Sequence, residues 1–119
     1  MPRSVLIVDD DPAFRALAGR MIRGAGMEVA GEADAAQTAI ASAEELRPDA
    51  ILVDVGLPDR SGIELAHDLA RRPWSPTVVL VSSDPDSAPG ADDGTETPLP
   101  FVPKAELPGA PLERLLSGI

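Results

Sequence analysis

Acidic side chains follow two apolar runs of this sequence at the point where each run ends. Asp9 and Asp10 come directly after Val5–Val8, and Asp54 comes directly after Ala50–Val53. If these ends meet in the fold, the carboxylates repel one another, and a hard divalent cation such as Mg²⁺ relieves that repulsion. The three acids therefore predict an acidic magnesium pocket.

A hydroxyl and an ammonium follow two further segments. Ser82 comes after Val78–Val81, and Lys104 lies three residues after Phe101, at the end of the last expected strand. At the same rim, the Lys104 ammonium would pair with Asp54 or with a bound anion. Acids, hydroxyl, metal and ammonium together suit phosphoryl transfer, which depends on positioning and charge neutralisation.

The apolar runs indicate strands that are buried on both faces of a parallel sheet. They lack the alternation of apolar and polar residues expected where one sheet face meets water. Two weaker segments are also consistent with strands. The five expected strands are Val5–Val8, Met27–Ala33, Ala50–Val53, Val78–Val81 and Leu99–Val102.

Helical segments alternate with these strands. The first begins at Pro12 after the capping residue Asp11 and ends near Gly24, and Asp34 is expected to cap the second. The apolar stripe of the first helix consists of Phe14, Leu17, Ala18, Met21, Ile22 and Ala25. The other helices are expected at Ala35–Leu46, Gly62–Arg72 and Pro111–Leu116. Alternating βα units predict an α/β, doubly wound parallel sheet with its ligand site at the carboxyl ends of the strands.

Length and composition bound the class of protein. A chain of 119 residues has room for one hydrophobic core, so we expect a single domain, 1–119. The formal net charge of −10 disfavours direct nucleic-acid binding, because the phosphate backbone carries the same sign. No cysteine is present, which excludes disulfides and thiolate chemistry. The first apolar run is too short for a signal or membrane segment, which predicts a soluble, cytoplasmic protein with no membrane contact.

One segment breaks the alternation of strands and helices. Residues 84–100 contain four prolines, two glycines and five acids without a single base. Proline removes a backbone donor and clashes with the preceding turn inside a helix, so this stretch disfavours one. We therefore expect an irregular, mobile acidic loop there.

Together, these motifs resemble the receiver domain of bacterial two-component response regulators. The matching segments, in the family's order, are Val5–Asp10, Asp54–Gly62, Val81–Ser83 and Phe101–Lys104. Each is common alone, whereas the set is specific, and the resemblance covers essentially the whole chain. It implies a flavodoxin-like, five-stranded sheet of order 2-1-3-4-5.

The resemblance assigns roles to the acids. By it, Asp54 would be the phosphoacceptor, receiving a phosphoryl group from a sensor histidine kinase or a phosphotransfer protein. Asp10 would bind Mg²⁺ directly and Asp9 mainly through water, while Asp54 and the backbone carbonyl of Gly56 would complete the ligand set.

The resemblance also implies a switch. Lys104 would neutralise charge on the phosphoryl oxygens, Ser82 would donate its hydroxyl to one of them, and Phe101 would turn into the space that the Ser82 loop vacates. Binding to a downstream protein or to an attached output domain would change in consequence. Such a protein is a phosphoacceptor signalling domain, not an enzyme beyond its own phosphorylation and dephosphorylation.

Two departures from the family pattern leave alternatives open. The acidic loop 84–100 takes the place of the family's fourth helix, and Thr97–Pro100 replaces its usual glycine-rich lead into the last strand. A receiver-like protein-interaction module that works without phosphate is therefore the alternative function. A magnesium-dependent phosphatase of the haloacid dehalogenase type, suggested by Asp9 and Asp11, is disfavoured because the chain is too short for that fold.

Overall fold

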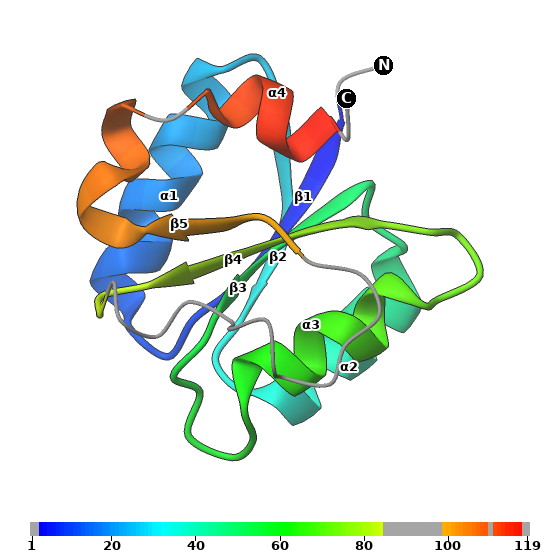
Figure 1. Cartoon of the computed structure of the whole chain (residues 1–119). Coiled ribbons are helices and arrows are strands. Elements are labelled where there is room, and N and C mark those ends of the chain that lie inside the picture. Colours follow the sequence, from blue (N-terminus) through cyan, green and yellow to red (C-terminus); the bar gives the residue numbers. More distant parts are fainter. Residues whose placement is uncertain (1–2, 85–98, 110, 118–119) are drawn as a thin grey trace.

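A five-stranded parallel sheet forms the centre of the protein. The computed structural model describes residues 3–84, 99–109 and 111–117. Over these residues the strand order is β2-β1-β3-β4-β5, which confirms both the predicted doubly wound architecture and the implied order (Figure 1). The strands are β1 (Ser4–Val8), β2 (Glu28–Ala33), β3 (Ala50–Asp54), β4 (Thr77–Ser82) and β5 (Phe101–Pro103).

Helices cover both faces of this sheet. Helices α1 (Pro12–Gly24) and α4 (Leu112–Ser117) pack on one face, and α2 (Ala36–Leu46) and α3 (Gly62–Ala70) pack on the other (Figure 1). A short 3-10 helix, η2 (Lys104–Gly109), joins β5 to α4 and was not expected from the sequence. None of the helices in the described part of the chain is long and apolar enough to cross a membrane.

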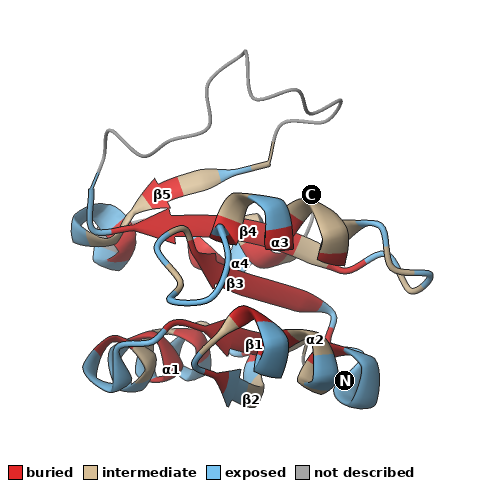
Figure 2. Ribbon diagram, turned by 90° about the horizontal axis from the view of Figure 1, so that it is seen from below, coloured by how far each residue is buried: buried red, intermediate tan, exposed pale blue. Residues whose placement is uncertain are grey.

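Successive residues of β1 point alternately into two hydrophobic cores. Val5 and Ile7 pack with α1 and α4, whereas Leu6 and Val8 pack with α2 and α3. All four are at most 1% exposed, and Figure 2 shows the same burial along β3 and β4. Burying one such side chain contributes about 1.5–3 kcal/mol relative to leaving it in water. The unbroken apolar runs are therefore explained by two cores, one on each side of the sheet.

The first helix agrees with its prediction. The Asp11 side chain accepts a hydrogen bond from the Ala13 amide at 2.9 Å, and Pro12 is the first helical residue. Within the stripe, Phe14 is buried, while Leu17 lies at its margin with 39% of its surface exposed. The helix is thus anchored at its start, directly beside the acids that end β1.

The cap expected for the second helix is wrong. Ala35, not Asp34, occupies the N-cap position of α2, and the Asp34 carboxylate instead accepts from the Thr38 hydroxyl. The first amides of α2 donate to Asp59, which lies in the loop between β3 and α3. The cap is thus supplied by a residue distant in sequence.

The remaining boundaries differ by a few residues. The last strand begins at Phe101 instead of Leu99, since Pro100 provides only a carbonyl to the ladder, where it accepts from Leu80. The expected acidic loop, 84–100, and the replacement of the family's fourth helix fall almost wholly on residues 85–98, which lie outside the described residues.

Candidate functional site

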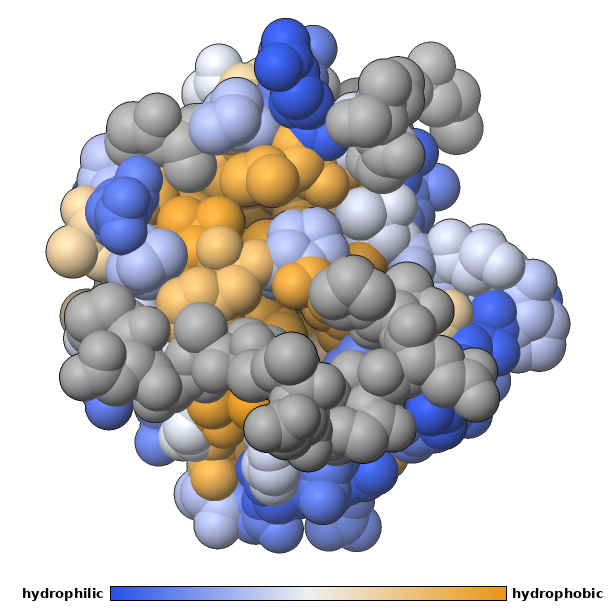
Figure 3. Space-filling view, in the orientation of Figure 1, coloured by the Kyte–Doolittle hydropathy of each residue, from blue (hydrophilic) through white to orange (hydrophobic). Residues whose placement is uncertain are grey.

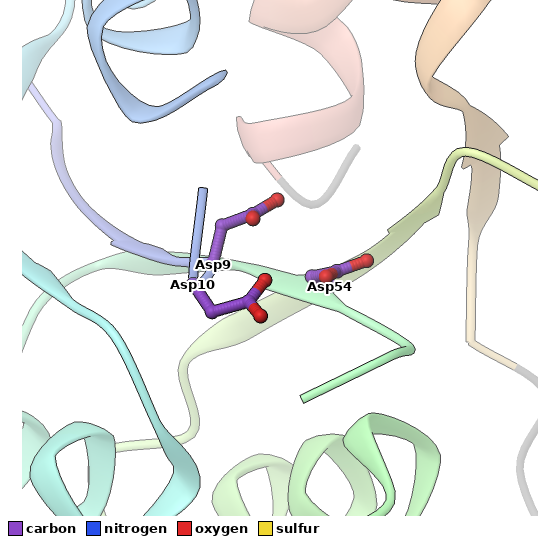
Figure 4. Close-up of side chains that lie close together, drawn as sticks. All are labelled: Asp9, Asp10 and Asp54. Carbon is purple, nitrogen blue, oxygen red and sulfur yellow. The ribbon is translucent and has the colours of Figure 1, made fainter. Parts of the chain in front are cut away.

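The three acids that the sequence singles out meet at the carboxyl end of the sheet. Asp9 and Asp10 follow β1, Asp54 ends β3, and these two strands are neighbours. One carboxylate oxygen from each lies within 4.8 Å of the others. Asp9 and Asp54 are buried and Asp10 is exposed. Figure 4 shows the three side chains projecting into the same space.

Backbone and side-chain hydrogen bonds fix the turn that carries Asp9. Its Oδ1 accepts from the Asp11 amide at 2.8 Å, and its own amide donates to the Ala33 carbonyl at 3.0 Å. The Arg15 guanidinium, from the first turns of α1, donates to the Asp9 carbonyl at 2.6 Å and also contacts Glu32. Sequence reasoning missed Arg15, because its role depends on how α1 folds back over the strand end.

The structure brings Lys104 to this cluster from the far end of the sequence. Its Nζ lies 2.6 Å from Asp9 Oδ2 and 3.7 Å from Asp54 Oδ1. The ammonium therefore pairs more closely with Asp9 than with Asp54, the partner expected from the sequence. It also lies 4.3 Å from the centroid of the Phe14 ring, a contact between residues distant in sequence.

Ser82 and Gly56 border the same cluster, whereas Phe101 stands apart. Ser82, the last residue of β4, is buried, and its hydroxyl accepts from the Asp84 amide at 3.0 Å. Gly56 lines the cavity over the acids, and its backbone amide lowers the pKa of the Asp54 carboxyl. Phe101 is half-buried on β5 and packs with the core beneath α2 and α3.

An open cavity of about 470 Å³ lies over the acids and is lined by Asp10, Asp54, Gly56, Ser82, Lys104 and Phe14, among others. A larger hollow, of about 750 Å³, lies between α1 and α4, where Figure 3 shows exposed apolar atoms. Its charged lining residues are only Glu113 and Arg114 among the described residues. Convergent carboxylates distinguish the smaller cavity as the place for chemistry.

Burial and negative charge perturb the central acid. Burial raises the pKa of Asp54, and repulsion from Asp9 raises it further, with a smaller contribution from Asp10. The Lys104 ammonium and the Gly56 amide oppose these effects and lower the same pKa. The cluster thus contains three carboxylates and one ammonium, so the ammonium does not balance the negative charge of the acids when all three are ionised.

The donor set fits a divalent cation with oxygen ligands. Three carboxylates converge, and Asp9 Oδ2, which is fully buried, lies 2.6 Å from the Lys104 ammonium. A buried carboxylate is stable only when it is paired with a positive charge. Lys104 supplies one positive charge to it, and a second cation would balance the remaining acids.

Comparison with known proteins decides the family. A model of the response regulator receiver domain matches residues 5–94. The chain belongs to this family. Receiver domains are signalling domains of two-component systems and typically use Mg²⁺, which agrees with the acidic cluster. The match ends ten residues before Lys104, which follows β5 and lies beside the acids in the structure.

The receiver resembles proteins from several bacteria. It is 39% identical over 82 residues to the transcriptional regulatory protein PdtaR of Mycobacterium tuberculosis, covering 69% of this chain and 40% of PdtaR. It is 32% identical over 83 residues to the chemotaxis protein CheY of Thermotoga maritima, covering 70% of this chain and 69% of CheY. The chain thus spans less than half the length of PdtaR.

Solved structures agree with the receiver fold. The response regulator domain of Thermotoga maritima CheB superimposes with a TM-score of 0.76, covering all of this chain and 98% of the other, at 23% identity. At that identity the likeness concerns the fold alone. It places the carboxyl end of the sheet, where the acids meet, in a known architecture.

Proposed function

We propose that this receiver accepts a phosphoryl group on Asp54 and changes its binding to other proteins in response. The observation that carries the proposal is the meeting of Asp9, Asp10 and Asp54 within 4.8 Å at the carboxyl end of the sheet. Lys104 reaches the same point. The donor would be the phosphohistidine of a sensor histidine kinase or a phosphotransfer protein in the cytoplasm.

In the proposed reaction the Asp54 carboxylate is the nucleophile. One of its oxygens forms a bond to phosphorus while the bond from phosphorus to the donor's imidazole nitrogen breaks, and that nitrogen keeps the electron pair. The attack requires ionised Asp54, so Lys104 and the Gly56 amide, which lower its pKa, favour the reactive form. The buried end of β3 fixes the carboxylate toward the open cavity.

Charge neutralisation is the second requirement. The carboxylates of Asp9, Asp10 and Asp54, with the backbone carbonyl of Gly56, would hold Mg²⁺. When bound, Mg²⁺ would neutralise negative charge on the phosphoryl oxygens. The Lys104 ammonium, 3.7 Å from Asp54 Oδ1, would hold another phosphoryl oxygen by a charge-assisted hydrogen bond.

The proposed switch uses the neighbouring strands. Ser82 lines the cavity, and a hydroxyl that accepts a hydrogen bond can donate one as well. Its donation to a phosphoryl oxygen would draw the β4 end inward. Phe101, half-buried on the adjacent strand β5, would then turn toward the space made free. The altered surface would bind a downstream protein or an attached output domain.

Mass spectrometry of the intact chain tests the proposal. After incubation with acetyl phosphate and Mg²⁺, the wild type should gain the mass of one phosphoryl group, and Asp54→Asn should gain none. Asp34→Asn, which removes an exposed acid away from the cavity, is the matched control and should react like the wild type. A folded wild type that takes up no phosphate would instead favour the receiver-like module that works without phosphorylation.

A further inference from the structure

The ammonium of Lys104 is held by an aromatic ring as well as by an acid. Nζ lies 4.3 Å from the centroid of the Phe14 ring and 2.6 Å from Asp9 Oδ2. The Lys104 side chain is 18% exposed, so this contact is largely shielded from water. A cation over a ring face is attracted by the negative centre of the ring, and the attraction grows as water is removed.

Phe14 is well placed to give this contact a fixed geometry. Phe14 lies in the first turn of α1 and lines the cavity. Only 7% of its surface is exposed. Phe14 belongs to the hydrophobic core that also contains Ile7 and Val81, whose strands carry the acids and the Ser82 hydroxyl. Core packing therefore fixes the position of the ring, whereas the flexible lysine side chain can adopt a rotamer that places its ammonium against the ring.

We propose that Phe14 is a positioning residue for the Lys104 ammonium, an inference that rests on the proposed phosphoryl transfer to Asp54. A lysine side chain has four flexible carbons and loses much rotamer freedom when its ammonium is fixed. Asp9 alone cannot fix it throughout the reaction, because the same carboxylate is a proposed cation ligand. The neutral ring of Phe14 does not bind the cation. It can therefore hold the ammonium beside Asp54 whether or not a cation is bound to Asp9.

The contact itself is measured by NMR without any phosphorylation. Protons on the carbon next to Nζ of Lys104 should be shifted upfield by the ring in the wild type. That shift should persist in Phe14→Tyr and be lost in Phe14→Leu, which keeps the apolar volume but has no ring. Ile22→Val, a fully buried change on the same helix and away from the cavity, should leave the shift unchanged. An unchanged shift in Phe14→Leu would overturn the proposal, whatever the protein does with phosphate.

The functional consequence is measured by the initial rate of phosphorylation with acetyl phosphate. Phe14→Leu should slow it about fivefold relative to the wild type, while Phe14→Tyr restores it. In a Lys104→Ala background, the same Phe14→Leu change should have little further effect, because a residue that acts through Lys104 loses its target. Equal slowing in both backgrounds, or slowing by Ile22→Val to the same extent, would show that Phe14 acts only through general stability. A wild type without phosphoryl uptake would count against the proposed function, while the NMR result would still decide the contact.

Discussion

The Asp59 carboxylate caps the helix that begins at Ala36. Its Oδ1 accepts from the Ala36 amide at 2.8 Å, and its Oδ2 accepts from the Gln37 amide at 3.1 Å. These two bonds lower the pKa of Asp59. They also join the loop that follows Asp54 to the start of α2. This loop, which carries Gly56, is thus attached to β3 at its start and to α2 through Asp59.

Replacing this cap should destabilise the protein. Asp59→Ala leaves two helix amides without their acceptor, and the midpoint of thermal unfolding should fall by a few degrees at pH 7. Asp34→Ala is the matched control, since within the described part of the chain Asp34 accepts only from the Thr38 side chain, and its effect should be smaller. Circular dichroism measures both. A larger loss for Asp34→Ala than for Asp59→Ala would contradict the assigned cap.

The same cap makes a pH-dependent contribution with a defined sign. The folded pKa of Asp59 lies below its ordinary value of 3.8, so ionised Asp59 stabilises the folded state at all pH values above 3.8. That contribution is lost as the pH falls through the lowered folded pKa. The difference in stability between wild type and Asp59→Asn should therefore shrink below pH 3.8. A difference that grows on acidification would contradict the lowered pKa of Asp59 in the folded state.

Asp54 should have the opposite effect on stability. Burial and Asp9 raise its folded pKa above 3.8, so the folded state holds this proton more tightly than the unfolded chain does. Stability is therefore lost as the pH rises from 3.8 through the folded pKa, and the penalty is complete above it. Without added metal, Asp54→Asn should be more stable than the wild type to urea at pH 7, and this gain should diminish toward pH 4.

A control separates this effect from general charge relief. The chain has a net charge of −10, so removing any acid reduces repulsion. Asp34→Asn removes an exposed acid and should give a smaller gain than Asp54→Asn at pH 7. Equal gains for the two variants would mean that the burial of Asp54 has no special cost.

Sequence reasoning located the acids but not every partner that they have. Strand ends and the first helix follow from local patterns, which is why Asp9 and Asp54 could be placed at one rim. Two of the contacts that were not predicted join residues far apart in sequence. Asp59 reaches α2 across the loop after β3, and Lys104 lies against Phe14 because η2, which begins at Lys104, and α1 contribute to the same hydrophobic core. No periodicity or cap signal encodes such contacts.

Gly62 should be intolerant of any side chain. A Cβ at this position would lie 2.0 Å from the Asp54 carbonyl oxygen, while its amide donates to Val55 at 2.9 Å. Gly62→Ala would push α3 away from the end of β3 and should cost about 3 kcal/mol or more of unfolding free energy. It should also slow phosphorylation, because the backbone of the proposed phosphoacceptor would move.

Gly24 is the matched control for this glycine. It ends α1, and a Cβ there would meet nothing within 4 Å. Gly24→Ala should therefore be neutral or stabilise the protein by up to about 1 kcal/mol. Urea unfolding of the two variants measures the contrast, and similar free energies would show that the close approach at Gly62 is relieved without cost.

Magnesium should stabilise the folded protein through the acidic cluster. Adding Mg²⁺ should raise the midpoint of thermal unfolding, because a cation that binds only the folded state shifts the equilibrium toward it. The rise should be reversed by EDTA and should nearly vanish in Asp10→Asn, whose carboxylate is exposed and has room to bind a cation. Asp11→Asn, which changes the adjacent helix cap, is the control and should keep the rise. An equal rise in all three proteins would place the cation elsewhere.

The position of the modified residue tests the central claim most directly. Borohydride reduces an aspartyl phosphate to homoserine, which peptide mass spectrometry locates in the sequence. After reaction of the wild type with acetyl phosphate and Mg²⁺, we expect homoserine at position 54 and aspartate at positions 9 and 10. Homoserine at another position, or an unmodified residue 54 in a protein that has gained phosphate, would contradict the account.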